Sequence, residues 1–419
     1  MLRRGALLAL AAAATARIAS AGPDAPSRRA ARARVVVVGA GFGGATAAKY
    51  VRMLSGGAIE VILVDTQAQL VSCPVSNRVL GGQRTLAQLT FGYGALDRVH
   101  GVKRLRGHVT AIDAERAAIV VDGTRLAYDR LIVAPGIDFM YDDVPALAGA
   151  ADTIPHAWKA GPQTLVLQRQ LRAMDDGGVF AIVVPLLPYR CPPAPYERAC
   201  QVAFYLKTHR PRSKVIVLDA NPVITSKRAL FERAWRELYP GMIEYVPGSA
   251  LRKVDVATRT VSTGFDTLRA DVLNIIPPQR AGKIAQSSGL ARVERRWCEV
   301  DFLTYESAVL PRVHVIGDAI DAGLPKSAHM ANAQARVCAA AVVAAIDGRP
   351  PDPAPAFANT CYSFVDDRQA MHISTLYRYD ALARAMQADG AGVLSERPAL
   401  AEGVDADAWA RRVWSDTLS

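Results

Sequence analysis

The chain has 419 residues, of which 51% are hydrophobic and 21% charged, with 31 Gly and 25 Pro. This composition is typical of a folded globular protein and excludes a disordered or collagen-like chain, and the length predicts two or three domains at about 150 residues each. Six Cys are too few for a disulfide scaffold of this size. The net charge of +11 is compatible with binding to a nucleic acid, an anionic surface or an acidic partner. The position of the excess charge in the chain distinguishes these partners.

The first 21 residues have the pattern of an export signal. Arg3 and Arg4 precede an apolar run over residues 5–14, and small residues follow at positions 19–21. A transmembrane anchor is the alternative, but the run has 10 residues where a span needs about 20. We therefore expect export to the periplasm, with the paired arginines favouring the twin-arginine route. No later stretch reaches about 18 uncharged apolar residues, so we expect no membrane span.

The same region carries most of the net charge. Residues 1–34 contain seven Arg and one acidic residue, which is +6 of the +11. The remainder has no Lys/Arg block with interleaved aromatic residues. The sequence therefore predicts no nucleic-acid binding.

A strand, a glycine turn and a helix follow in order. Residues 35–38 are four valines, the turn reads GAGFGG, and residues 45–53 have helical character. Gly39 permits the tight turn, Gly41 lets the backbone approach a pyrophosphate, and Gly44 allows close packing of helix on strand. The N–H groups at the start of the helix are free to bind phosphate.

A second strand, residues 59–64, ends at Asp65, 21 residues beyond Gly44. An acid at this distance accepts hydrogen bonds from the ribose hydroxyls of an adenine dinucleotide. A glycine turn with only a structural role is the alternative. The strand, helix and distal acid together favour a dinucleotide site.

Two later segments indicate which dinucleotide binds. A strand over residues 128–133 ends in Ala134-Pro135-Gly136, and another over residues 313–316 ends in Gly317-Asp318. These segments resemble the second and third signatures of two-dinucleotide-fold flavoproteins of the glutathione-reductase type, which implies FAD. The alternative role of Asp318 is an N-cap, because a helix is expected over residues 327–345.

The expected second nucleotide site is absent from the sequence. A strand over residues 177–184 leads into residues 185–193, which read PLLPYRCPP and have no glycine fingerprint. Prolines lack the N–H donors that a phosphate cradle needs. A further strand over residues 214–219 keeps the domain topology. We therefore expect electrons to come from a donor other than NAD(P)H.

The sequence resembles the flavin-binding subunit of flavocytochrome c sulfide dehydrogenase along nearly the whole expected mature chain. The most specific stretches are RCPPAPYER and IIPPQRAGKI. The stretches that carry the resemblance are residues 36–50, 155–161, 190–198, 275–284, 314–319 and 359–363.

The resemblance implies roles for three cysteines. In that family one cysteine is joined to the flavin 8α-methyl, and Cys73 matches it; a free buried Cys is the alternative. Two others form a redox disulfide beside the flavin, and Cys191 and Cys361 match this pair, with a structural staple as the alternative. The implied reaction is attack of hydrosulfide on the disulfide, followed by passage of electrons through FAD to a separate c-type cytochrome subunit in a heterodimer. The sulfur is expected to leave as elemental sulfur or polysulfide.

The residues around Cys191 offer further candidates. Cys191 precedes a helix over residues 194–207, whose N-terminus favours a thiolate. Glu197 lies on the first turns of this helix and is either a proton exchanger for the sulfur chemistry or a helix-dipole acid. Lys326 either stabilises an anionic reduced flavin or is a solvated lysine. Trp414 is a candidate for a C-terminal Trp that packs near the flavin.

The other cysteines are predicted to fill the core: Cys200, Cys298 and Cys338 lie in apolar segments. No cysteine pair has C-x-x-C or His-ligand spacing, so we expect no metal site.

The predicted fold is an α/β flavoprotein with two dinucleotide-type domains and a C-terminal α+β interface domain. The expected divisions are an export signal and arm (1–33), a discontinuous FAD domain (34–154 and 285–350), a second Rossmann-like domain without a nucleotide site (155–284) and the interface domain (351–419).

Two alternative functions remain at this stage. Sulfide:quinone oxidoreductase shares the fold and the sulfur chemistry, but residues 365–419 carry six arginines among many acids and no strongly amphipathic helix, which disfavours membrane docking. The other alternative is a non-catalytic partner protein that contains FAD.

Overall fold

The computed structural model describes residues 31–264 and 266–419. The predicted export signal and most of the arm after it lie outside the described residues. Within the described residues, no helix is both long enough and apolar enough to cross a membrane. Residues 32–419 form one compact unit.

A five-stranded parallel sheet forms the first half of this unit. Its central strand is all valine after the first two residues and is buried on both faces, as is typical of a parallel sheet covered by helices. The strand order is β21 (Val313–Val315), β9 (Arg130–Val133), β1 (Ala33–Val38), β2 (Ile59–Asp65) and β5 (Lys103–Arg106). A strand near residue 314 therefore pairs in one sheet with strands from the first third of the chain.

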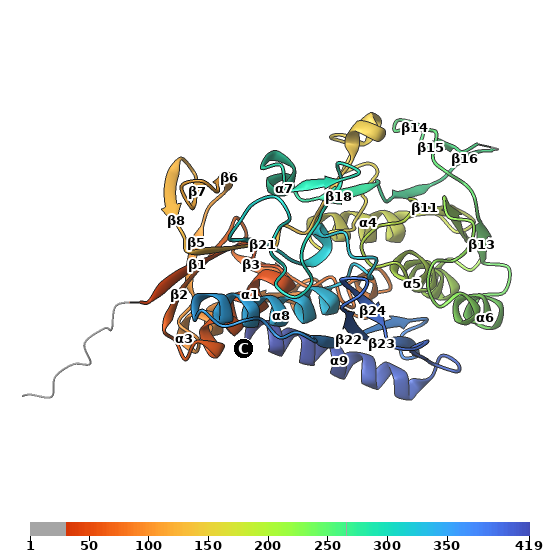
Figure 1. Ribbon diagram of the computed structural model, residues 1–419. Helices are drawn as coiled ribbons and strands as arrows, with labels where there is room; N and C mark the ends of the chain where they lie inside the picture. Colours follow the sequence, from red (N-terminus) through yellow and green to blue (C-terminus); the bar gives the residue numbers. More distant parts are fainter. Residues whose placement is uncertain (1–30, 265) are drawn as a thin grey trace, which may run out of the picture. The chain divides into compact units, whose positions relative to one another are not determined.

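Three helices pack together beside this sheet (Figure 1): α1 (Phe42–Leu54), α8 (Ala328–Ile346) and α9 (Leu400–Leu418). The close approach of α1 to β1 depends on glycine. Gly39 has φ +93°, which L-residues rarely adopt, and a Cβ on Gly44 would overlap the Gly39 carbonyl oxygen. The predicted strand, glycine turn and helix are thus confirmed.

A second parallel sheet has the order β13 (Ile243–Val246), β12 (Lys214–Asp219), β11 (Val179–Val184) and β17 (Val272–Ile275). The helices associated with it are α4 (Pro162–Ala173), α5 (Ala194–His209) and α6 (Arg228–Leu238). The strands predicted at residues 177–184 and 214–219 and the helix predicted at 194–207 are therefore present.

The C-terminal part is an antiparallel sheet followed by α9. The long hairpin of β22 (Ala356–Phe364) and β23 (Ala370–Asp380) is extended by β24 (Ala385–Ala388) and β25 (Val393–Leu394). β22 pairs only with β23, so its other edge faces the rest of the molecule.

Smaller elements complete the described chain. They are α2 (Asn77–Leu80), α3 (Gly94–Arg98), α7 (Lys283–Ser287), β3 (Gln69–Val71), β4 (Thr90–Gly92), β6 (Val109–Asp113), β7 (Ala118–Val121), β8 (Thr124–Ala127), β10 (Ile137–Phe139), β14 (Lys253–Asp255), β15 (Thr260–Ser262), β16 (Thr267–Arg269), β18 (Gln279–Ala281), β19 (Ala291–Val293) and β20 (Trp297–Cys298).

Gly44→Ala should destabilise the protein. The methyl group of the new alanine forces α1 away from the turn. Overpacking of this kind lowers the free energy of unfolding by about 3 kcal/mol. Urea unfolding and the FAD content of the purified protein measure the effect. Gly43→Ala is the matched control, because its Cβ would meet its nearest neighbour at 3.5 Å, an ordinary contact. Equal stability of the two variants would contradict the packing argument.

Candidate active site

The glycine turn is open on the side where a phosphate would approach. Gly41 is exposed and a Cβ there would meet nothing within 4 Å. Asp65 lies at the mouth of the turn, where its Oδ2 accepts the Ala40 N–H at 2.5 Å and its Oδ1 accepts the Gln67 N–H at 2.6 Å. The structure thus places Asp65 at the turn, where its carboxylate fixes the turn's backbone. Its role toward ribose hydroxyls stays a prediction.

The second predicted segment lines the same turn. The Ala134 N–H donates to the Val38 carbonyl at 2.8 Å, and the Ala134 carbonyl lies where a Cβ on Gly39 would be. Gly136 has φ +63°, and a Cβ there would lie 3.1 Å from a guanidinium nitrogen of Arg190. Gly136 therefore leaves room for Arg190.

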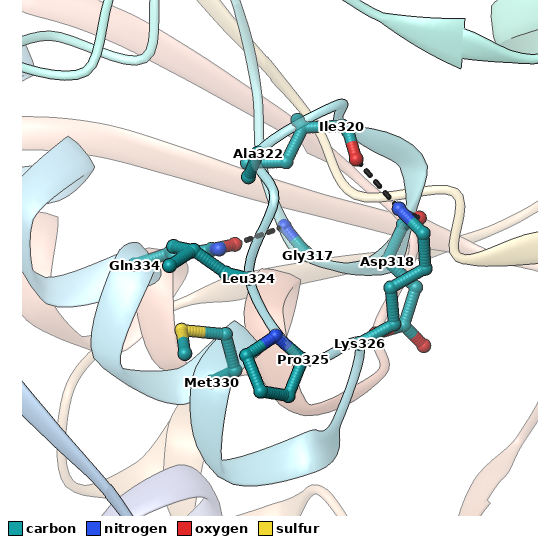
Figure 2. A pocket seen from close by; sticks show the side chains of 9 residues that line it. All are labelled: Gly317, Asp318, Ile320, Ala322, Leu324, Pro325, Lys326, Met330 and Gln334. Carbon is teal, nitrogen blue, oxygen red and sulfur yellow. Dashed lines mark hydrogen bonds between the residues drawn. The ribbon is translucent and has the colours of Figure 1, made fainter. Parts of the chain in front are cut away.

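The third segment lines a small pocket (Figure 2). The Gly317 N–H donates to Gln334 Oε1 at 2.8 Å. Asp318 Oδ2 accepts from Arg190 Nε at 2.7 Å, while Asp318 Oδ1 is buried without a hydrogen-bond partner in the described chain. A buried unpaired carboxylate oxygen is costly, and a hydroxyl or N–H group of a bound FAD would satisfy it.

The expectation that Asp318 caps the following helix is wrong. The N-cap of α8 is Ser327, whose Oγ accepts the Met330 N–H at 3.1 Å. Asp318 lies one loop earlier, in a short helical turn, and its carboxylate is held by Arg190 instead.

The solvated alternative for Lys326 is also wrong. Lys326 Nζ donates to the Ile320 carbonyl at 2.6 Å and to the Asp318 carbonyl at 3.0 Å (Figure 2), and it lies 3.8 Å from the Trp297 ring centroid. Burial lowers the pKa of Lys326 to about 8. The main-chain oxygen of Lys326 accepts the Cys191 N–H at 2.7 Å, so this lysine also fixes the backbone of Cys191.

Cys191 and Cys361, 170 residues apart in sequence, are brought together. Both are free thiols in this structure, and their side chains interact. This interaction lowers the pKa of Cys361 to about 7, and it raises the pKa of Cys191 well above its usual value. Cys361 is therefore the sulfur that ionises first, and the expectation that the helix N-terminus favours a thiolate on Cys191 is wrong.

Glu197 lies against this pair. Its Oε1 accepts the Phe364 N–H at 2.9 Å and its Oε2 accepts from Asn77 Nδ2 at 2.8 Å. Burial raises the pKa of the Glu197 carboxyl group, and its negative charge raises the pKa of both thiols. A buried carboxyl group with a raised pKa beside two thiols is suited to proton exchange with them.

Cys73 is on the loop after β3 and is close to Arg190. The distance from Arg190 Nη1 to Cys73 Sγ is 3.9 Å. The preceding Ser72 Oγ accepts from Trp414 Nε1 at 2.8 Å, which places the candidate C-terminal Trp beside this loop. Arg190 thus connects Cys73, Asp318 and the Cys191 loop.

Arg190 and Lys227 are two site residues that the sequence reasoning did not single out. Arg190 directly precedes Cys191 in the RCPPAPYER stretch, and this position could have marked it as a site residue. Lys227 is 5% exposed and donates to the Cys361 carbonyl at 2.9 Å. No local sequence pattern marks Lys227.

Cys191 and Lys227 both have left-handed backbones, with φ of 56° and 54°. This conformation costs about 1–2 kcal/mol for a residue other than glycine. Such strain is commonly found at functional sites.

The second nucleotide-type sheet has its own buried acid. Asp219, at the end of β12, accepts from Tyr196 Oη at 2.6 Å and Tyr245 Oη at 3.0 Å on Oδ2, and from the Asn221 N–H and Nδ2 on Oδ1. This carboxylate is fully occupied by protein donors, so it is not free for ribose hydroxyls.

The three predicted core cysteines, Cys200, Cys298 and Cys338, are all fully buried. No group of three or more metal-ligating side chains occurs in the described ranges.

His156 makes the stability of the protein depend on pH. Burial, with Arg198 and Lys159 nearby, lowers the pKa of His156 to about 3, and its Nδ1 accepts the Trp158 N–H at 2.9 Å. Below pH 6.5 the unfolded chain binds a proton here that the folded chain does not, so stability falls as pH falls, by up to about 1.4 kcal/mol per pH unit. Urea unfolding between pH 6.5 and 4.5 measures this slope.

His156→Asn, which keeps an acceptor near the Nδ1 position, should lose this part of the pH dependence. The exposed His108→Asn should keep it. A wild-type slope no steeper than that of His156→Asn would contradict the assignment.

Three family models match the chain. They are described as the pyridine nucleotide-disulphide oxidoreductase family at residues 33–168, the central part of the sulfide dehydrogenase [flavocytochrome c] flavoprotein chain at 164–277, and the flavin-binding part of flavocytochrome c sulphide dehydrogenase at 353–418. The last two cover the second sheet with its helices and the C-terminal sheet.

Among solved structures, the sulfide:quinone oxidoreductase of Aquifex aeolicus is similar, with a TM-score of 0.74 and 16% identity over 92% of this chain and 91% of that one. A NAD-dependent persulfide reductase from A. fulgidus has a TM-score of 0.60 and 16% identity, and covers 91% of this chain and 77% of that one. At these identities the likeness shows the fold: an α/β flavoprotein with two dinucleotide-type domains.

Two curated sequences are also similar. The mitochondrial sulfide:quinone oxidoreductase of Dictyostelium discoideum is 22% identical over 322 residues, 73% of this chain and 69% of that sequence. The sulfide dehydrogenase [flavocytochrome c] flavoprotein chain of Chlorobaculum thiosulfatiphilum is 56% identical over 46 residues, which is 11% of this chain and 94% of that sequence. The chain therefore belongs to the family of flavocytochrome c sulfide dehydrogenase flavoprotein chains, a family of sulfide-oxidising, FAD-binding oxidoreductases.

Proposed function

We propose that this protein oxidises hydrosulfide at the Cys191–Cys361 pair and passes the electrons through FAD to a c-type cytochrome. The observation that carries the proposal is that the fold brings Cys191 and Cys361 together beside the buried carboxyl group of Glu197. The residues present fit FAD, because an open glycine turn and a buried, unpaired Asp318 oxygen belong to the same parallel sheet and its following loops.

The working oxidised form of the pair is a disulfide, which hydrosulfide attacks by thiol–disulfide exchange. One cysteine becomes a persulfide and the other leaves as a thiolate. A second hydrosulfide then removes the outer sulfur as the hydrodisulfide anion and leaves one thiol and one thiolate. Loss of two electrons and the thiol proton restores the disulfide. FAD supplies the two-electron acceptor chemistry and can release electrons singly to a one-electron partner.

Glu197 is proposed to exchange a proton with the entering or leaving sulfur species in this cycle. Burial raises the pKa of its carboxyl group, which favours acceptance of a proton. Asn77 and the Phe364 N–H hold its two oxygens in place.

The acceptor is proposed to be a separate subunit. The sequence contains no C-x-x-C-H haem attachment motif. The family descriptions name a flavocytochrome c, so we infer a c-type cytochrome as the partner in a heterodimer. Export to the periplasm through the predicted signal would bring the chain to a compartment where such cytochromes and disulfides occur.

Sulfide should bleach the visible flavin absorption of the purified protein, and added cytochrome c should restore it while becoming reduced. Cys191→Ser and Cys361→Ser should each lower the bleaching rate at least about 100-fold while FAD stays bound, since either change removes the disulfide. Stopped-flow absorbance measures the bleaching rate of the wild type and of both variants.

Cys338→Ala, which removes a buried sulfur from α8, is the matched control and should retain bleaching. A protein that contains FAD but does not bleach would overturn the enzyme proposal. Bleaching that a soluble quinone reverses and cytochrome c does not would replace the cytochrome acceptor with the quinone-linked alternative.

We also propose that Cys73 carries the flavin covalently. Its position beside Arg190 and the Asp318 segment supports this proposal. After acid precipitation the flavin should remain with the wild-type protein and be released from Cys73→Ser, as followed by absorbance and peptide mass spectrometry. Complete release from the wild type would falsify the link without affecting FAD binding.

A further inference from the structure

Lys227 is a buried lysine beside the sulfur pair that the proposed cycle does not use. It precedes α6, is 5% exposed, and its Nζ donates to the main-chain oxygen of Cys361 at 2.9 Å. Its left-handed backbone, with φ 54°, sets it apart from the helix that follows. The loop thus holds a strained conformation while it directs an ammonium group at Cys361.

The charge of Lys227 acts on three titratable groups, which are Cys361 on β22, Cys191 before α5 and Glu197 on α5. No carboxylate forms an ion pair with Lys227 in residues 31–264 and 266–419. A buried ammonium without an ion-paired carboxylate is unusual, because its charge needs compensation. A thiolate beside it would supply that compensation.

Four other charged or titratable groups lie around this cluster. Arg78 on α2 acts on Glu197, Arg198 on α5 acts on Glu197 and Cys191, and Arg190 acts on Cys191. On α8, His329 Nδ1 accepts the Thr360 N–H at 3.0 Å, and burial lowers the pKa of His329, so this ring is neutral near pH 7. Lys227 is therefore the cation that bonds directly to the Cys361 residue.

We propose that Lys227 is a positioning residue that makes Cys361 the leaving sulfur, so that hydrosulfide attacks Sγ of Cys191. In this step the S–S bond breaks and Cys361 departs with its electron pair as a thiolate. A new S–S bond joins the sulfide sulfur, which keeps its hydrogen, to Cys191. One negative charge enters with hydrosulfide and one remains on Cys361. The inference rests on the proposed function for the identity of the nucleophile.

The physical reason is leaving-group acidity. In thiol–disulfide exchange the sulfur with the lower thiol pKa leaves faster. The interaction with Cys191 lowers the pKa of Cys361 most, and the positive charge of Lys227 lowers it further, while burial and Glu197 oppose this. Lys227 also lowers the pKa of Cys191. Because its ammonium bonds to the main chain of Cys361 itself, removal of the ammonium should raise the pKa of Cys361 more than that of Cys191, so the difference between the two sulfurs should diminish.

The test is the pH dependence of alkylation in the reduced, FAD-loaded protein. Iodoacetamide labels each thiol at a rate that follows its thiolate fraction, and peptide mass spectrometry separates Cys191 from Cys361. In the wild type the midpoint for Cys361 should lie near pH 7. In Lys227→Met it should rise by about 1 to 3 pH units, as expected for loss of an adjacent opposite charge.

Two further variants separate charge from shape. Lys227→Arg should keep the midpoint near that of the wild type. Lys227→Gln, which can still donate to the Cys361 carbonyl but is neutral, should behave like Lys227→Met, and it gives the result if the methionine variant does not fold. Lys207→Met is the matched control, because Lys207 also donates to a main-chain carbonyl, that of Leu238 at 3.0 Å, but is exposed. An unchanged Cys361 midpoint in Lys227→Gln would overturn the proposal.

A second readout locates the attacked sulfur. After one equivalent of sulfide is added to the oxidised protein, alkylation and mass spectrometry should find the persulfide on Cys191 in the wild type and on both cysteines in Lys227→Gln. A persulfide on Cys361 of the wild type would overturn the assignment. If sulfide yields no persulfide at all but the midpoints shift as expected, the proposed function fails while the control of Cys361 acidity by Lys227 stands.

Discussion

The buried ion pair between Arg190 and Asp318 is the contact on which the site depends. The two side chains are 17% and 9% exposed, and Arg190 Nε lies 2.7 Å from Asp318 Oδ2. Removing one partner from such a pair leaves a charge in the interior and costs about 3–5 kcal/mol. The pair joins the loop of Cys191 to the segment after β21, and the same guanidinium reaches Cys73. Three segments that are distant in sequence are thereby held at one place.

Cys361 reaches this place because β22 is anchored at successive residues. Asn359 Oδ1 accepts from Ser327 Oγ, and the Thr360 N–H donates to His329. Further along the strand, the Cys361 carbonyl accepts from Lys227 and the Phe364 N–H donates to Glu197. Residues from α5, α8 and the loop before α6 therefore fix the edge of β22 that does not pair with β23. The sheet alone would not determine where Cys361 lies.

These anchors explain what the sequence could and could not predict. The glycine turn, the strand of valines and Asp65 are local patterns with one physical interpretation, and the structure places them together. Lys227 and Asn77 contribute through contacts made by residues more than a hundred positions away, and no local pattern encodes such contacts. Asp318 has two interpretations in the sequence, a flavin contact and a helix cap, because both use the same residue type. The pairing of Cys191 with Cys361 came from family resemblance, since 170 residues of chain separate them.

The proline-rich loop at residues 185–193 lacks a nucleotide site and instead positions Cys191. Four of its nine residues are proline and have no N–H group. Of the N–H groups that remain, that of Leu187 donates to Asn221, that of Arg190 to Gln279 and that of Cys191 to Lys326. A phosphate cradle requires free N–H groups, and here the donors are used to hold the loop itself. The same bonds fix Cys191 in its left-handed conformation beside Cys361, so the backbone donors that would bind a dinucleotide in a related domain instead position a sulfur.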